Sequence, residues 1–297
     1  MMLKGIHFLL TYTCNYACDH CFLYCSPSSQ GIFTVKQIKN VLEEAIKIGT
    51  VDWIYFEGGE PFLYYPVMVE GLRLAKEKGF KVGVVTNSYW ATSVEDAYLW
   101  LKPFSEVNID NFSISDDSFH YDNEEESLSK IAEKALNNLK LPIGTICIEE
   151  PTVKKDQEKG EPVIGGGAMF KGRAVEKLIE GLPRKPWQDL NSCPYEDFTG
   201  LGRIHVDPFG NTHICQGLSL GNFWETPLSE LLKGYNPATH PICDSLIRGG
   251  PAQLVKDFNL DHEEEYVDEC HLCYLARLSL INKFPKLLAP KQVYGIS

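Results

Sequence analysis

The sequence is short of basic residues. Its 297 residues contain 28 Lys and Arg against 40 Asp and Glu, which gives a formal net charge of −12. Each contact with a phosphate group needs a nearby Lys or Arg, so this balance disfavours binding to DNA, RNA or an anionic membrane. Small molecules and proteins are therefore the expected partners.

The sequence also lacks a long hydrophobic run. The apolar stretch nearest the N-terminus, Ile6–Leu10, has five residues, far fewer than the roughly 20 that span a bilayer. It is not framed by the basic region and small-residue cleavage site of a signal peptide. We therefore expect a cytoplasmic protein with no membrane-spanning segment.

Cysteine, in contrast, is abundant, with ten residues in two main groups. Disulfides are rare in the reducing cytosol, so clustered cysteines there favour metal binding or catalysis. Because we expect the protein to lie in the cytoplasm, the many cysteines predict metal sites.

The first part of the chain alternates strand-like and helix-like segments. This rhythm is typical of a parallel sheet covered by helices, and a sixth strand is expected before Leu182. The fold class is therefore α/β, a partial (β/α)6 TIM-like barrel, in which the loops after the strands carry the chemistry. The five clear strands are predicted at Lys4–Thr11, Val51–Phe56, Lys81–Thr86, Val107–Ser115 and Ile143–Glu149, and the helices at 34–48, 66–78, 93–104 and 124–139.

The rhythm breaks near Pro183, where prolines, glycines and further cysteines follow. We place a domain boundary there, between a core at residues 1–182 and a loop-rich, cysteine-containing C-terminal extension at residues 183–297. A loop-rich segment of this size has difficulty folding alone, so a metal that holds it together is expected.

Cys14, Cys18 and Cys21 lie within eight residues, directly after the first predicted strand. Iron–sulfur clusters use thiolate ligands, and a cubane normally takes four of them. Three thiols from one loop suggest one iron left open for a small ligand. Cys25 as the fourth ligand of an electron-transfer cluster, a zinc site and inert cysteines are the alternatives.

A second motif, Gly58-Gly59-Glu60-Pro61, follows the second predicted strand. Paired glycines let the backbone approach a ligand closely, and Glu60 can accept a hydrogen bond from an ammonium group. By itself the motif also fits an ordinary turn between a strand and a helix.

Together, the Cys-x3-Cys-x2-Cys loop and the Gly-Gly-Glu-Pro turn resemble the radical S-adenosylmethionine (SAM) superfamily. The resemblance implies an enzyme in which Cys14, Cys18 and Cys21 hold a [4Fe-4S] cluster. It implies that SAM binds the open iron and is reductively cleaved to a 5′-deoxyadenosyl radical, which abstracts hydrogen from substrate. A low-potential donor, ferredoxin or flavodoxin, is expected to supply the electron.

The resemblance also assigns the remaining site residues. It places the SAM amino group at Gly58, Gly59, Glu60 and Pro61. It implies that Asn87 and Ser115 contact the ribose or the carboxylate of SAM. It also implies that Arg173 binds the SAM carboxylate, because a guanidinium suits bidentate pairing. Apart from the resemblance, His120 is a candidate for proton transfer, because an unperturbed histidine side chain titrates near neutrality. The alternatives are polar caps of strand ends, a surface salt bridge for Arg173 and a loop hydrogen bond for His120.

The tail cysteines resemble the SPASM and shorter twitch extensions of radical SAM enzymes. This resemblance implies one auxiliary [4Fe-4S] cluster, and zinc in the same sulfurs is the alternative. The nominated ligands are Cys193, Cys215, Cys270 and Cys273, with Cys243 in reserve.

The substrate is the least determined property. Peptide modifiers often carry an appended recognition domain, and a first strand at Lys4 leaves no room for one before it. We therefore expect a small-molecule or protein substrate. A peptide-modifying enzyme of natural-product maturation, and a non-catalytic Fe–S or zinc protein, are the alternatives.

Overall fold

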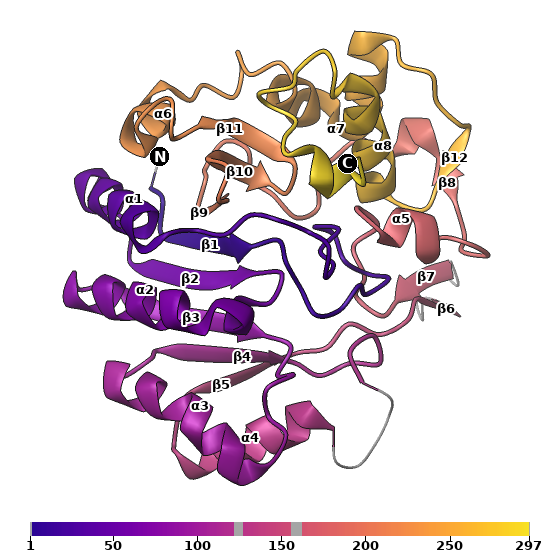
Figure 1. Cartoon of the computed structure of the whole chain (residues 1–297). Coiled ribbons are helices and arrows are strands. Elements are labelled where there is room, and N and C mark those ends of the chain that lie inside the picture. The colour runs from indigo at the N-terminus through magenta and orange to yellow at the C-terminus, as the bar shows by residue number, and fades with distance from the viewer. Residues whose placement is uncertain (1, 122–126, 156–161, 297) are drawn as a thin grey trace.

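An eight-stranded sheet runs through the molecule, in the order β11-β10-β9-β1-β2-β3-β4-β5 (Figure 1). The computed structural model describes residues 2–121, 127–155 and 162–296. The strands of the sheet are β1 (Gly5–Thr11), β2 (Trp53–Gly58), β3 (Lys81–Thr86), β4 (Asn111–Ser115), β5 (Ile143–Ile146), β9 (Arg203–Val206), β10 (Asn211–Cys215) and β11 (Leu218–Asn222).

The sheet is the wall of an open barrel. Every neighbouring pair from β9 to β5 is parallel, whereas β10 and β11 add an antiparallel edge. Within the described residues no ladder joins β11 to β5, so the wall does not close. The expected partial barrel is confirmed.

Four helices cover the outer side of this wall: α1 (Val35–Ile48), α2 (Tyr65–Glu77), α3 (Val94–Val107) and α4 (Leu128–Asn138) (Figure 1). Helix α1 begins where the sequence predicts, because Thr34 and Gln37 form a capping box, and it ends at Gly49 in the left-handed conformation. Residues 124–126 of the last predicted helix lie outside the described part of the chain. Helix α3 extends three residues past its predicted end, so β4 begins only at Asn111.

Side chains point alternately to the two faces of each strand, so one set packs against the outer helices and the other faces the inside of the barrel. Phe8 and Phe56, on β1 and β2, stack with ring centroids 4.9 Å apart, and Phe56 lies beneath Gly71 of α2. The next residues along these strands, Leu9 and Glu57, face the opposite way and line a cavity. The inner face of the barrel is therefore the place for a site.

The sixth parallel strand is not where we expected it. After β5 the chain forms a separate hairpin of β6 (Thr152–Lys155) and β7 (Pro162–Gly165). The sixth strand is β9, beyond Leu182, and it pairs with β1 instead of β5. The domain limits at 1–182 and 183–297 stay a prediction, and one sheet continues across them.

The tail is more helical than its proline and glycine content suggests. Helix α7 contains Gly249 and Gly250 in non-helical conformations. A Cβ on Gly250 would lie 2.3 Å from the backbone of Asn191 and Ser192, so this break makes room for the segment that leads to Cys193. The remaining elements are η1 (Pro61–Tyr64), α5 (Ala174–Lys177), β8 (Lys185–Pro186), η2 (Trp187–Asp189), α6 (Leu228–Gly234), α7 (Cys243–Phe258), β12 (Glu265–Tyr266), α8 (Glu269–Leu280) and η3 (Lys291–Tyr294).

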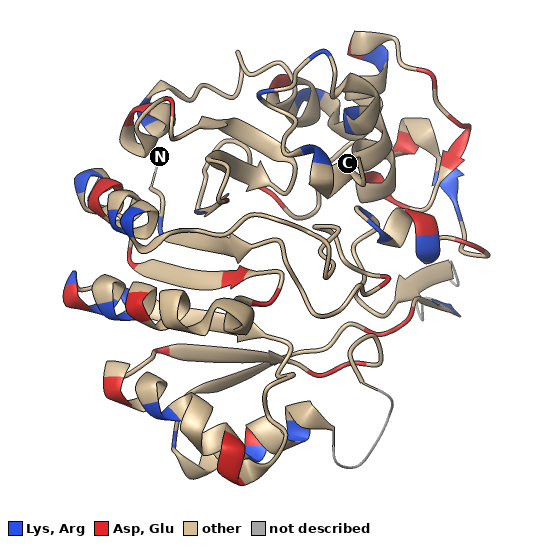
Figure 2. Ribbon diagram, viewed as in Figure 1, with Lys and Arg blue, Asp and Glu red and all other residues tan. Residues whose placement is uncertain are grey.

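Charge is spread over the exterior. Figure 2 shows acidic and basic residues interspersed on the helices and loops, with the strands of the sheet largely uncharged. Among the described helices, none has the length and apolar character needed to cross a membrane.

Candidate active site and the second cysteine group

The loop between β1 and α1 carries its three cysteines to a cavity of about 240 Å³ at the carboxyl ends of the strands. Cys14, Cys18 and Cys21 line this cavity together with Cys25. Five of the other nominated residues line it as well: Gly58, Gly59, Asn87, Ser115 and His120. The structure thus brings together residues from four separate loops.

The glycine turn after β2 is hydrogen-bonded to the start of the cysteine loop. The Gly59 N–H donates to the Thr11 carbonyl at 2.7 Å, and the Glu60 N–H donates to the Thr13 carbonyl at 2.9 Å. A Cβ on Gly59 would lie 2.2 Å from the Thr13 oxygen. Gly59 is therefore needed for the close contact between the two motifs, in addition to the close approach to a ligand that we expected.

The Glu60 carboxylate is buried and faces its own chain. It accepts hydrogen bonds from the Phe62 N–H at 2.9 Å, the Thr86 hydroxyl at 2.9 Å and the Asn87 N–H at 2.8 Å. Burial raises its pKa to about 7, against the lowering effect of these donors. Neither Glu60 nor Pro61, which opens η1, is among the residues that line the cavity. Glu60 holds the end of β3 in place.

Asn87 continues this connection to the cysteine loop. Its amide nitrogen Nδ2 donates to Asn15 Oδ1 at 2.8 Å and lies 3.7 Å from Cys14 Sγ. A chain of contacts therefore runs from Glu60 through Asn87 to the first cysteine. Ser115, at the end of β4, lies on the cavity wall.

Arg173 occupies a different position from the one expected. Its guanidinium donates to the carbonyls of Cys18 at 2.6 Å and Cys25 at 2.8 Å, and its backbone N–H donates to the carbonyl of Cys21 at 3.0 Å. It does not line the cavity. The bidentate fork is used to clamp the cysteine loop, because the loop carbonyls present two acceptors at the right spacing.

The thiols of the loop differ in their surroundings. Burial raises the pKa of Cys14 and of Cys18 to about 12. A hydrogen bond with the Cys25 thiol, opposed by burial, lowers the pKa of Cys21 to about 6. Because metal ligands are thiolates, Cys14 and Cys18 would each release a proton on binding a metal at neutral pH.

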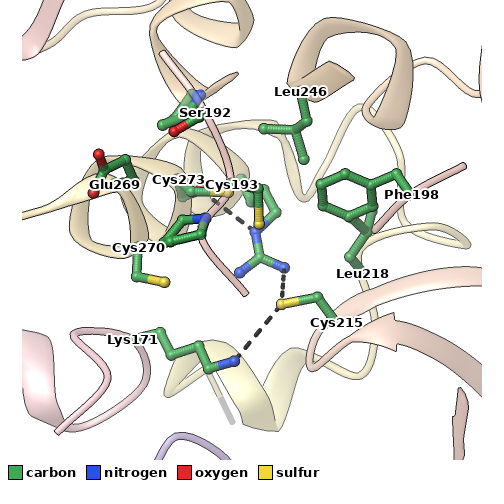
Figure 3. Close-up of a pocket in the computed structure, with 13 residues that line it drawn as sticks. Lys171, Ser192, Cys193, Phe198, Cys215, Leu218, Leu246, Glu269, Cys270 and Cys273 are labelled. Carbon is green, nitrogen blue, oxygen red and sulfur yellow. Dashed lines mark hydrogen bonds between the residues drawn. The ribbon is translucent and has the colours of Figure 1, made fainter. Parts of the chain in front are cut away.

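The second group of cysteines surrounds a smaller cavity (Figure 3). Cys193 precedes β9 and Cys215 ends β10. Cys270 lies in the first turn of α8, and Cys273 lies three residues later on the same face of the helix. The reserve candidate Cys243 is buried at the start of α7 and does not line this cavity.

Two buried cations contact this second group. Lys171 Nζ donates to Gln216 Oε1 at 2.7 Å and lies 3.7 Å from Cys215 Sγ. Arg277 donates through Nη1 to the Gln216 carbonyl at 3.1 Å and lies 4.0 Å from the same sulfur. Within the described part of the chain, no salt bridge joins either cation to a carboxylate. A buried cation needs a counter-charge, and the cysteine sulfurs are the groups placed to supply it.

A comparison with protein families identifies the barrel. Residues 8–141 match the family model described as the Radical SAM superfamily. The chain carries a radical SAM domain. This domain contains both the cysteine loop and the Gly58-Gly59 turn, the two features that carried the resemblance in the sequence.

Two known proteins are similar to part of this chain. The putative peptide biosynthesis protein YydG of Bacillus subtilis (strain 168) is 28% identical over 117 residues, 39% of this chain and 37% of that protein. The S-adenosylmethionine-dependent nucleotide dehydratase of Selenomonas ruminantium is 33% identical over 86 residues, 29% of this chain and 30% of that protein. The matched segments span about a third of the length of these relatives.

The solved structure of BtrN in complex with AdoMet and 2-DOIA has a similar fold. Its TM-score is 0.53 at 14% sequence identity, over 78% of this chain and 82% of that one. At this identity the similarity concerns the fold alone. It extends well beyond residues 8–141, so the tail also takes part in the shared arrangement.

The radical SAM domain also places residues at the cavity that the sequence did not single out. His120 Nδ1 lies 2.7 Å from Asp117 Oδ1. Burial opposes ionisation of Asp117, but the hydrogen bond with His120 lowers its pKa below the usual value. The i, i+3 spacing of Asp and His after a predicted strand was the available signal for Asp117. Glu57, which directly precedes the glycine motif, also lines the cavity.

Proposed function

We propose that this chain is a radical SAM enzyme whose Cys14, Cys18 and Cys21 hold the SAM-binding [4Fe-4S] cluster. The observation that carries the proposal is the hydrogen-bonded union of the cysteine loop with the Gly58-Gly59 turn at the rim of one cavity. When bound, the cluster supplies the electron that splits SAM into methionine and a 5′-deoxyadenosyl radical. Ferredoxin or flavodoxin is the proposed electron donor.

The side chains around the cavity then bind, orient and exclude water. Arg173 sets the path of the cysteine loop through two carbonyls, and Asn87 steadies the loop beside Cys14. Apolar residues such as Leu9 and Ile148 line the cavity and keep water away from a reactive substrate radical. We assign the SAM contacts to the backbone of Gly58 and Gly59 and to the side chains of Asn87 and Ser115.

His120 is the proposed proton-transfer residue. Asp117 lies against Nδ1 and thereby favours the tautomer in which Nε2 carries the lone pair. His120 lines the cavity, so Nε2 is the atom that accepts a proton from, or returns one to, a bound substrate. Asp117 acts through His120 as a positioning residue.

The tail cysteines are proposed to hold one auxiliary [4Fe-4S] cluster. The donor set fits, because four sulfurs surround one cavity and Lys171 and Arg277 are buried beside them without carboxylate partners. Four thiolates around iron supply the negative charge that these cations require. Zinc on the same four sulfurs is the competing occupant.

The substrate is proposed to be a small molecule or a protein. A peptide is the second candidate, and the observation that favours it is the similarity to YydG, a protein described as a putative peptide biosynthesis protein.

The test separates the two cysteine groups. Anaerobically purified protein should hold about eight iron per chain, about four for each cubane, and should form 5′-deoxyadenosine from SAM when reduced. Replacing Cys14, Cys18 and Cys21 by Ala should abolish this cleavage, whereas the exposed Cys147→Ala variant should behave as wild type. The Cys270→Ala, Cys273→Ala double variant should keep about four iron and still cleave SAM.

Two outcomes would overturn parts of the proposal. A reduced, iron-loaded protein that does not cleave SAM is the non-catalytic Fe–S alternative. About four iron and one zinc per chain would make the tail a structural zinc site.

A further inference from the structure

A second set of potential ligands lies on the inner face of the barrel, outside both cysteine groups. His7 on β1, Glu57 on β2 and His205 on β9 come from three neighbouring strands, and His7 and His205 are directly opposite each other in the parallel register. Glu57 is the last residue but one of β2.

The three side chains converge on one point. His7 Nδ1 lies 3.3 Å from Glu57 Oε2, and His205 Nε2 lies 3.1 Å from Glu57 Oε1. The three ligand atoms all lie within 4.8 Å of one another. The site is shielded, since the His205 side chain is 5% exposed and that of Glu57 20%.

The His7 nitrogen that faces Glu57 lacks a hydrogen bond. His7 Nδ1 is buried and makes no hydrogen bond among the described residues, although the Glu57 carboxylate is only 3.3 Å away. Buried polar atoms are nearly always hydrogen-bonded, so an unpaired imidazole nitrogen directed at a carboxylate indicates a shared ligand between them.

The neighbouring side chains hold the His7 ring in this orientation. Tyr55 stacks on it at 4.7 Å between ring centroids, and Trp53 stacks on Tyr55 at 5.4 Å. Because the rings form a continuous stack on one face of the sheet, His7 cannot turn away without disturbing its neighbours. The ligand atoms are therefore preorganised.

We propose that His7, Glu57 and His205 bind one divalent transition-metal ion of the Zn²⁺ type. Two imidazoles and a carboxylate are a donor set that zinc and similar ions accept, with bonds of about 2.0–2.2 Å. Tetrahedral geometry at that bond length separates neighbouring ligand atoms by about 3.3–3.6 Å, so ligand atoms that lie within 4.8 Å of one another would move together slightly around a bound ion. Three protein ligands leave one position open.

The proposed metal site adjoins the candidate active site, because Glu57 lines the 240 Å³ cavity as well as belonging to the cluster. Its ligands are two imidazoles and a carboxylate, so it does not depend on what the cysteines hold.

Titration with Zn²⁺ alone tests the site in the full-length protein with its cysteines filled by anaerobic Fe–S reconstitution. Calorimetry should detect about one Zn²⁺ per chain. His205→Ala and Glu57→Gln should each weaken binding at least tenfold, because each removes a ligand, with iron content unchanged. His262→Ala, which alters an exposed histidine, is the matched control and should bind as wild type.

X-ray absorption at the zinc edge of the loaded wild-type protein decides the matter even if a variant fails to fold. A first shell of nitrogen and oxygen at about 2.0–2.1 Å supports the site. A sulfur shell at about 2.3 Å, no zinc uptake, or full binding in both ligand variants would each overturn it.

Discussion

Replacement of Arg277 by Met should lower the reduction potential of the proposed auxiliary cluster. The Arg277 side chain is 2% exposed, and its guanidinium lies 4.0 Å from Cys215 Sγ. Methionine retains an unbranched side chain of similar length and removes the charge. Reduction adds one negative charge to the cluster, and a nearby cation stabilises that added charge.

The distances set the size of the effect. With an effective dielectric constant of about 20, two unit charges interact by about 4 kcal/mol at 4 Å and about 2 kcal/mol at 8 Å. These two distances correspond to the near sulfur and to the far side of a cubane. For a one-electron couple, about 59 mV corresponds to about 1.4 kcal/mol, so the potential should fall by roughly 90–180 mV.

The assay is a potentiometric titration followed by electron paramagnetic resonance, with iron content measured on the same sample. Lys171→Met should shift the potential in the same direction, since Lys171 Nζ lies 3.7 Å from the same sulfur. Lys177→Met removes an exposed charge six residues away and should leave the potential unchanged. An iron-loaded Arg277→Met protein with an unchanged or higher potential would refute the reasoning.

Three further predictions concern the first cysteine group. Gly59→Ala places a Cβ 2.2 Å from a backbone oxygen of the cysteine loop, so it should destabilise the protein by about 1–3 kcal/mol and lower its melting temperature. Gly202→Ala adds a Cβ that would meet no atom within 4 Å and should leave the melting temperature unchanged. Equal melting temperatures of the two variants would contradict the close contact. Arg173→Met should reduce the iron retained after desalting. Arg173→Lys should restore the iron content only in part, because one ammonium group does not reproduce the guanidinium fork. A variant with full iron content but weakened SAM binding would instead support a contact between Arg173 and the SAM carboxylate. Cys25→Ser should keep both its iron and SAM cleavage, and loss of the cluster would identify Cys25 as a fourth ligand.

Much of the barrel could be read from the sequence because its signals are local. The capping box of Thr34 and Gln37 and the terminal Gly49 bound a helix within 16 residues of chain. The sequence predicts the strand Lys81–Thr86 with the bounds that the structure has, since a short run rich in valine between Gly79 and the polar Asn87 and Ser88 needs no distant partner to be recognised.

The sixth parallel strand could not be predicted in the same way. Arg203–Val206 is four residues long and has a weak pattern of its own. Its place in the sheet depends on pairing with β1, nearly 200 residues earlier in the chain. Short strands of this kind are defined by their partners, because the ladder and the burial it provides supply most of their stability.

The sequence by itself determined the class of fold, the cysteine loop and the glycine turn, because each is a compact pattern of neighbouring residues. Only the tertiary structure decided what the side chains do. It turned Arg173 onto the loop carbonyls, placed Arg277 beside Cys215 and brought His205 to His7 and Glu57. Such contacts join residues far apart in the chain, and only the packing of the sheet fixes their distance and orientation.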